Sequence, residues 1–260
     1  MKVVKKVLLG ILIFIIALIA LVGILIAVNS PANVKAMNKS VEVFLDTVDD
    51  YYTLTEVDCG EYKNLKLFGI MKFNVKQYDV EGVGNLAVMT TNIGVMQMAT
   101  VVLTPTERDM PLISMDYMYM LGNRTAYLEV YDLVLEQDEE YAALLEQLGA
   151  VRADYDSIET VTPSAAWYDS LKTEGFYKKG KKADDDALIE MMHRGLDSVM
   201  IYSSALPELD EEAHAHKTVL QKTYSDGLID NGGISTDIFV KALGTDETRI
   251  FFDSVLFKAD

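Results

Sequence analysis

An uncharged and strongly apolar run near the N-terminus constrains this chain more than any other feature. It extends over the twenty-two residues from Val7 to Val28, and three lysines precede it within residues 2–6. A helix of that length rises by about 33 Å, and crossing the core of a bilayer takes roughly 20 apolar residues. A cleavable signal peptide is the alternative, but its apolar core is usually only about 7–15 residues long, and small residues at A-x-A spacing should follow it. Because residues 29–31 are Asn-Ser-Pro instead, we expect an uncleaved anchor.

The anchor sets the expected domain organisation. Residues 1–6 are expected to lie in the cytoplasm, residues 7–28 to span the membrane, residues 29–39 to form a linker, and residues 40–260 to fold as one domain. The lysines before the apolar run favour a cytoplasmic N-terminus under the positive-inside bias. We therefore expect a single-pass membrane protein whose domain lies outside the cytoplasm.

The charge and cysteine content exclude several functions. Removing the three lysines before the anchor from the 23 basic residues leaves 20 against 40 acidic residues, a formal net charge of −20 for the rest of the chain. Such a surface repels nucleic acid and anionic lipid headgroups, so no nucleic-acid partner is expected. Cys59 is the single cysteine, which rules out an internal disulfide, a thiolate zinc site and an iron–sulfur cluster.

The first half of the domain has the pattern of β-structure. A helix is expected first, from Val41 to Tyr52, because apolar residues recur there at helical spacing. The expected strands are Leu65–Phe73, Lys76–Val80, Leu86–Thr90, Val95–Leu103, Leu112–Leu121 and Thr125–Leu133. Turn-forming residues separate these short segments, which predicts an antiparallel meander.

The second half is expected to be mainly helical. The expected helices are Gln137–Leu148, a segment that opens at Pro163-Ser164 and ends near Gly175, Ala187–Ser203, Glu211–Tyr224 and Glu247–Phe257. Four lysines within residues 178–182, followed by three aspartates, are interpreted as a solvated loop. Helices on either side of an antiparallel sheet give an α/β fold, a three-layer α/β/α sandwich.

The strand expected from Leu112 to Leu121 carries the main candidate for catalysis. Side chains alternate between the faces of a sheet, and both faces of this strand are largely apolar, as in a central strand that is covered on both sides. Asp116 is therefore expected where water is scarce. Burial raises the pKa of a carboxyl group, which suits a proton donor near neutral pH. The alternative is a structural aspartate bonded to a neighbouring backbone or helix end.

Methionine is concentrated in the same region. Seven of the thirteen methionines lie between Met89 and Met120. Methionine is flexible and polarisable, so it can line a pocket for a large flat apolar ligand or fill an ordinary adaptable core. Both interpretations stay open on the sequence alone.

Other motifs carry no function. Gly82–Ala87 matches a loose dinucleotide pattern, but a strand rather than a helix is expected after it. His214 and His216 are two residues apart on an expected helix and do not share a face, and His193 stands alone. We expect no metal site and no resident cofactor.

Two parts of the sequence resemble the ferredoxin-dependent bilin reductases. The family has a strand that ends in proline, a short turn, a segment that leads to an aspartate, and a further strand. The corresponding segments here are VVLTP at residues 101–105, DMPLISMD at 109–116 and TAYLEVYDL at 125–133. The C-terminal resemblance lies in Tyr224, Asn231, FVKALG at residues 239–244 and SVLF at 254–257.

The resemblance implies an α/β/α sandwich that holds a linear tetrapyrrole between the sheet and the C-terminal helices. Such an enzyme takes electrons from a protein such as ferredoxin, and its own acids supply protons to the tetrapyrrole. The proton-donor aspartate of the family corresponds to Asp116. The expected ligand-binding residues are Met98, Thr100, Ser114, Met118 and Asn231.

The chain also departs from that family. Several members carry a glutamate and a histidine on the two strands before the aspartate, where this chain has an apolar run near Met89 and Thr100. Met110 replaces a leucine, and Ser114 replaces a glycine. A strongly acidic body also disfavours docking of ferredoxin, itself acidic, and ferredoxin cannot reach a body outside the cytoplasm. Two hypotheses follow: a membrane-anchored, bilin-reductase-like oxidoreductase, or a tethered binding or interaction module that keeps the fold without the chemistry.

Overall fold

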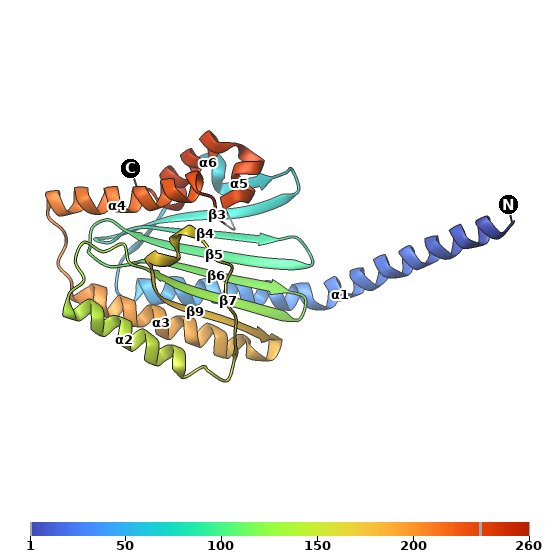
Figure 1. The fold of residues 1–260 in the computed structure, drawn as a ribbon, viewed down its shortest axis with the longest axis horizontal. Coiled ribbons are helices and arrows are strands. Elements are labelled where there is room, and N and C mark those ends of the chain that lie inside the picture. Colours follow the sequence, from blue (N-terminus) through green and yellow to red (C-terminus); the bar gives the residue numbers. More distant parts are fainter. Residues whose placement is uncertain (1, 234–235, 260) are drawn as a thin grey trace.

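A nine-stranded antiparallel sheet forms the centre of the protein in a computed structural model, which describes residues 2–233 and 236–259 (Figure 1). The strands are β1 (Leu54–Val57), β2 (Asn64–Leu67), β3 (Met71–Val80), β4 (Gly84–Asn92), β5 (Met96–Pro105), β6 (Leu112–Met120), β7 (Asn123–Tyr131), β8 (Glu159–Thr160) and β9 (Lys172–Lys181). They pair in the order β1-β3-β4-β5-β6-β7-β9-β8, and β2 also pairs with β3. The strands from β3 to β7 therefore form the meander that the sequence predicts.

Helices cover both faces of the sheet (Figure 1). The helices on one face are α1 (Lys2–Asp49), α2 (Glu139–Ala153) and α3 (Asp185–Ala205), and those on the other are α4 (Glu211–Asp230), α5 (Thr236–Leu243) and α6 (Thr245–Phe251). Three short 3-10 turns are η1 (Gly60–Lys63), η2 (Trp167–Leu171) and η3 (Lys182–Asp184), and a π-turn, η4 (Phe252–Leu256), extends α6. The expected three-layer α/β/α sandwich is confirmed.

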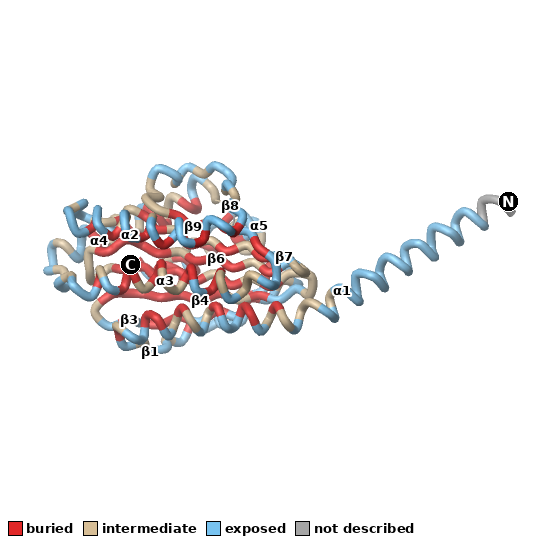
Figure 2. Tube along the Cα trace, turned by 90° about the horizontal axis from the view of Figure 1, so that it is seen from below, coloured by how far each residue is buried: buried red, intermediate tan, exposed pale blue. Residues whose placement is uncertain are grey.

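Cross-strand register assigns the side chains to two separate cores. Val101, Met115 and Leu128 are neighbours across β5, β6 and β7, and they pack toward α1 and α3. One residue along, Thr100, Asp116 and Tyr127 are neighbours on the opposite face. The strands are buried along most of their length (Figure 2), as expected for a sheet that is covered on both sides.

Two of the helices on the outer layers begin at aspartate caps. The side chain of Asp138 accepts the amide of Tyr141 at the start of α2, at 2.7 Å, and Asp210 accepts the amide of Ala213 at the start of α4, at 2.9 Å. Each cap satisfies an amide that the helix itself cannot bond. The caps fix where α2 and α4 leave their preceding loops.

The expected strand from Leu65 to Phe73 is wrong in its extent. It contains all but the first residue of β2, a reversal at Phe68–Ile70 and the start of β3. Phe68 and Gly69 have φ angles of 53° and 72°, which turn the chain back on itself. Gly69 is a turn-forming residue, but the apolar residues Phe68 and Ile70 on either side of it give this segment the pattern of a continuous strand.

The interpretation of the lysine cluster as a solvated loop is wrong. Residues 172–181 form β9, which pairs with β7 along its whole length. Lys178 is fully buried, and its Nζ donates to Thr160 Oγ1 at 2.9 Å and to the Ile158 carbonyl at 3.4 Å. Lys179, its neighbour, is exposed. The alternation of a strand places one lysine inside and the next outside.

The expected linker from residue 29 to residue 39 is helical and belongs to α1, which corrects the prediction of a separate juxtamembrane segment. Asn33, Ala36 and Met37 in this segment are already buried against the body. The N-terminal part of α1 is long and apolar enough to cross a membrane. It extends away from the body as part of the same helix, at an angle to the part that packs on the sheet (Figure 1).

The C-terminal half also differs from the prediction in detail. The helix expected from Pro163 is only the short turn η2, because its chain leads directly into β9. Helix α5 lies where no helix was expected. The helices expected at Gln137–Leu148, Ala187–Ser203 and Glu211–Tyr224 are present as α2, α3 and α4.

Candidate functional site

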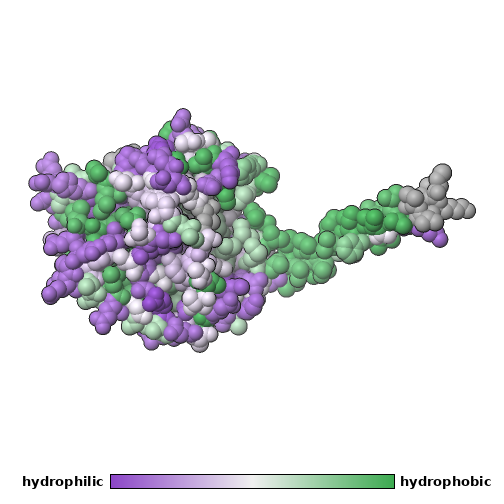
Figure 3. Space-filling view, in the orientation of Figure 1, coloured by the Kyte–Doolittle hydropathy of each residue, from purple (hydrophilic) through white to green (hydrophobic). Residues whose placement is uncertain are grey.

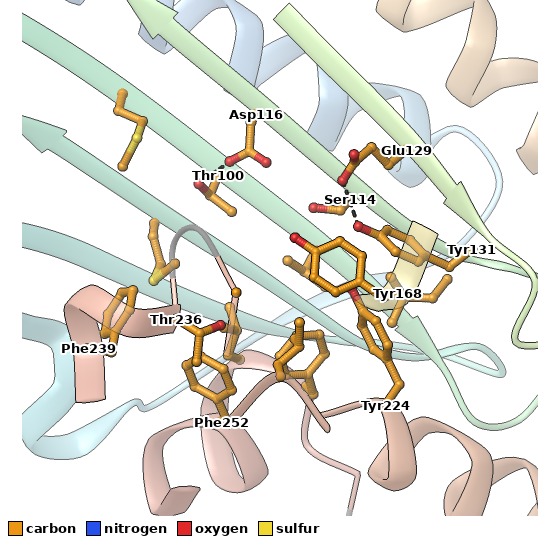
Figure 4. Close-up of a pocket in the computed structure, with 18 of the residues that line it drawn as sticks. Thr100, Ser114, Asp116, Glu129, Tyr131, Tyr168, Tyr224, Thr236, Phe239 and Phe252 are labelled. Atoms are coloured by element: carbon orange, nitrogen blue, oxygen red, sulfur yellow. Dashed lines mark hydrogen bonds between the residues drawn. The ribbon is translucent and has the colours of Figure 1, made fainter. Parts of the chain in front are cut away.

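A cavity lies between the sheet and the layer of α4, α5, α6 and η4 (Figure 4). It encloses about 740 Å³ of empty space, including the part that opens to solvent. Its floor is formed by β4 to β7, and its roof by residues that include Leu228, Thr236, Phe239, Phe252 and Leu256. Binding pockets for small molecules are mostly apolar with a few polar groups, and this cavity has that character.

Asp116 points into this cavity from the middle of β6 (Figure 4). Its Oδ1 accepts a hydrogen bond of 2.5 Å from the Thr100 hydroxyl, which lies directly across on β5. Burial raises the pKa of Asp116 to about 6; the bond from Thr100 acts in the opposite direction, and the nearby carboxylate of Glu129 adds a smaller upward effect. About a tenth of Asp116 is therefore protonated at pH 7, and this form can donate a proton.

Glu129 is a second carboxyl group on the floor of the cavity. It lies on β7 beside Ser114 of β6. Its oxygens accept hydrogen bonds from Tyr131 at 2.6 Å and Tyr177 at 3.1 Å, and Lys172 Nζ lies 2.8 Å away. Glu129 is thus held by donors on several sides, whereas Asp116 is bonded to the Thr100 hydroxyl.

A tyrosine cluster forms one end of the cavity. The rings of Tyr131 and Tyr224 are 5.0 Å apart between centroids, and Tyr168 lies 6.1 Å from Tyr131 and 6.2 Å from Tyr224. Burial raises the pKa values of Tyr131 and Tyr224 well above the ordinary value, so both hydroxyls stay neutral at physiological pH. Lys172 Nζ lies 4.8 Å from the centre of the Tyr168 ring. This end of the cavity offers flat surfaces with hydroxyl groups at their edges.

Metal binding has no support in the described part of the chain. Within it, no group of three or more His, Cys, Asp or Glu side chains could hold a metal ion. His214 and His216 are exposed on α4, and His193 Nδ1 lies 2.7 Å from the Thr47 hydroxyl on the far side of the sheet.

Comparison with solved structures finds this architecture in phytochromobilin synthase from tomato, which was crystallised in complex with biliverdin. The two structures superpose with a TM-score of 0.70, and the match covers 85% of this chain and 83% of that chain at 10% sequence identity. This chain shares the fold of phytochromobilin synthase. No protein-family model matches the chain, and no curated protein matches it. At 10% identity the likeness to phytochromobilin synthase establishes the fold alone.

The structure brings four of the six predicted site residues into this one cavity. Met98, Thr100, Ser114 and Asp116 all line it. Met118 lies on the same strand and face but outside the lining, and it is only half-buried. Asn231 is exposed at the end of α4, where its Nδ2 lies 3.3 Å from the Gly227 carbonyl. The catalytic role of Asp116 and the ligand-binding roles of the other five residues remain predictions.

The sequence interpretation missed Glu129 and the tyrosine cluster. In the sequence, Thr125, Tyr127, Glu129 and Tyr131 alternate along one expected strand, so a shared face was visible. What was missing is which face meets Asp116. That depends on the register between β6 and β7, and a shift of one residue reverses every assignment.

Proposed function

We propose that this protein is a membrane-anchored, bilin-reductase-like protein that binds a linear tetrapyrrole in the cavity above Asp116. The observation that carries the proposal is a protonatable carboxyl group inside a cavity between the sheet and the C-terminal helices, in a fold shared with an enzyme crystallised with biliverdin. Apolar and aromatic walls suit a flat conjugated ligand.

The polar groups in the cavity suit the donors of such a ligand. A linear tetrapyrrole presents pyrrole N–H groups along one edge, and the carboxyl oxygens of Asp116 and Glu129 are hydrogen-bond acceptors on the cavity floor. Among the described residues, 2–233 and 236–259, no lysine or arginine lines the cavity. The acidic side groups of the ligand would therefore point to the open side, where water can solvate them.

The proposed reaction reduces one double bond of the tetrapyrrole with two electrons and two protons. An external one-electron carrier, of which ferredoxin is one kind, supplies the electrons in two steps. Asp116 gives one proton to the reduced ligand and regains it from water at the open side, and solvent supplies the other. A pKa of about 6 keeps enough of Asp116 protonated for this role near neutral pH.

A second candidate function is a tethered binding or interaction module without catalysis. Met89 and Thr100 face each other across β4 and β5 at the places where the resemblance leads one to expect a glutamate and a histidine. Both line the cavity, and neither carries a group that can exchange a proton at neutral pH. The cavity then binds its ligand but lacks two of the groups that would complete the chemistry.

Biliverdin titration of the purified full chain in detergent tests tetrapyrrole binding, which both candidate functions include. We expect the visible spectrum of biliverdin to shift at micromolar protein, and Ser114→Phe, which fills the cavity, to abolish the shift. Thr125→Phe, a matched addition on the same face outside the cavity, should leave it intact. Absence of any shift in the unsubstituted chain would reject tetrapyrrole binding.

Addition of a one-electron reductant to the biliverdin complex then tests catalysis. If Asp116 is the proton donor, Asp116→Asn should keep the spectral shift and slow reduction by a factor of about 10²–10⁴, the usual contribution of a positioned acid. Equal rates in the two chains would reject the role of Asp116, and no reduction in either would favour the non-catalytic module.

A further inference from the structure

Large apolar side chains are exposed at one end of the body, on three chain reversals. They are Phe68 and Ile70 between β2 and β3, Ile93 between β4 and β5, and Met120 at the end of β6, with 55%, 79%, 38% and 46% of their surfaces exposed. We call these four residues the apolar rim. The register of the meander places all three reversals at the same end of the strands. This is also the end from which α1 leaves the body, and apolar residues gather there (Figure 3).

Contacts between α1 and the body fix the position of this end of the body along the axis of α1. Side-chain atoms of Ile26 lie 3.7 Å from the position that a Cβ on Gly94 would take. Ile26 belongs to the last helical turn of the apolar run. The chain reversal that carries Ile93 therefore lies beside the end of that run. If the run crosses a bilayer to its end, Ile93 cannot lie far above the membrane surface.

The body braces α1 on both sides of Pro31. Gln97 Nε2 donates to Ser30 Oγ at 3.1 Å, and Asn33 Nδ2 donates to the Leu121 carbonyl at 3.0 Å. The chain is helical throughout, with no irregular segment between the apolar run and the body. The body therefore cannot swing freely on a tether, and its rim keeps one position relative to the helix.

The backbone at the tip of the rim gives an independent indication. Phe68 has a φ of 53°, in the left-handed region that Asn and Gly favour and bulky side chains avoid. A large aromatic residue at a strained, exposed position contributes little to the folded body itself. Strain of this kind is retained where the side chain has a use outside the fold.

Charge at this end also fits a membrane surface. Lys66 and Lys72 form a cross-strand pair next to the β2–β3 turn, and Lys181 and Lys182 lie at the end of β9; all four are exposed. Long lysine side chains can lay their stems along apolar surface and reach the headgroups. Three aspartates that follow Lys182 are engaged by protein groups: Asp184 accepts the Lys181 amide, Asp185 pairs with Arg124, and Asp186 pairs with Lys39.

We propose that the apolar rim inserts into the interfacial layer of the bilayer that α1 crosses, and so holds the body on the membrane in one orientation. The proposal rests on the membrane anchor of the proposed function but not on tetrapyrrole chemistry. Because Ile26 holds this end of the body beside the end of the apolar run, we infer that the rim contacts the bilayer and not a partner protein or a second copy.

The test uses the full chain, one copy per nanodisc, with an environment-sensitive fluorophore on single introduced cysteines and spin-labelled lipids as quenchers. The sites are Ile70→Cys in the rim, Val219→Cys on the exposed surface of α4 as the matched control, and Phe14→Cys in the apolar run. Cys59 is buried, and the chain without introduced cysteines gives its background labelling. We expect at least twofold stronger quenching at Ile70→Cys than at Val219→Cys, and strong quenching at Phe14→Cys.

Equal quenching at Ile70→Cys and Val219→Cys, with Phe14→Cys quenched, overturns the rim and leaves the anchor standing. Loss of quenching at Phe14→Cys as well overturns the anchor itself. A probe at Ile70→Cys that is shielded only at high protein concentration, without lipid quenching, shows a second copy on the rim and also overturns the proposal. Phe68→Asn provides a second variant: it should lower quenching at Ile70→Cys without lowering the thermal midpoint, because asparagine tolerates the left-handed turn.

Discussion

At the scale of single residues, Asp116 links stability to pH. Its pKa is raised from 3.8 to about 6 in the folded chain, so the folded state holds its proton more tightly than the unfolded state does. The stabilisation of the folded state by this tighter proton binding is fully present below about pH 4 and is lost as the pH rises through about 6. Asp116→Asn removes the charge, so we expect it to stabilise the chain at pH 8 by an amount on the order of 3 kcal/mol.

Thermal unfolding of the two chains across pH 4–8 measures this difference. The gain from Asp116→Asn should grow between pH 4 and pH 7 and then stay constant. A constant difference over the whole range would mean that Asp116 titrates normally, and the acid in the cavity would lose its special role.

Glu129 should influence the protonation of Asp116. The charge of Glu129 raises the pKa of Asp116, so Glu129→Gln should move the Asp116 midpoint to lower pH. The pH dependence of the Asp116→Asn effect, repeated in the Glu129→Gln background, measures this shift. Asp169→Asn, which removes the other carboxylate that contacts Lys172, is the control and should leave the midpoint unchanged. A midpoint that does not move in Glu129→Gln would show that the two acids act independently.

Asp116 could be predicted from the sequence, and Glu129 could not, for one physical reason. The two apolar faces of a single strand identify a buried acid without any knowledge of its neighbours. Glu129 enters the site only through its pairing beside Ser114, and that pairing depends on a turn in which Leu121 has a left-handed φ of 53°. The expected strands place the turn at residues 122–124, whereas the chain turns at residues 121–122, a position that leucine does not signal.

At the scale of elements, β9 shows how charge can hide a strand. The lysines from 178 to 182 have the composition of a loop, but pairing with β7 buries Lys178 and exposes Lys179. Composition alone cannot reveal this, because the partners of Lys178 come from Ile158 and Thr160, some 20 residues earlier. The helices α2, α3 and α4, whose apolar spacing is local, were predictable.

The two adjacent lysines also provide a matched test of this strand. Lys178→Ala leaves the Ile158 carbonyl and the Thr160 hydroxyl without their buried donor, and we expect a loss of about 1–3 kcal/mol in the free energy of unfolding. Lys179→Ala, on the exposed side of the same strand, should change it by less than about 0.5 kcal/mol. Denaturant unfolding measures both, and similar effects at the two sites would contradict the register of β9.

At the scale of the whole molecule, one helix has two parts of different character. Its first part is apolar on all sides, and the rest packs on the sheet through Met37, Phe44 and Val48. Hydropathy predicted the apolar run, but no turn signal marks the change from that run to the body, since the helix continues through it. The expected boundary at residue 40 therefore lies inside the folded body.

Two truncated chains locate the true boundary. Removing residues 1–28 deletes the apolar run and leaves the buried part of α1 intact, so the remaining chain should be soluble and keep its thermal midpoint within a few degrees. Removing residues 1–39 also deletes Asn33, Ala36 and Met37, which are buried. Loss of a buried methionine alone typically lowers stability by about 2–5 kcal/mol, and each kcal/mol shifts the midpoint of a domain of this size by about 2–4 °C. We therefore expect the shorter chain to unfold at least about 6 °C lower by circular dichroism; equal midpoints would place the boundary at residue 40 after all.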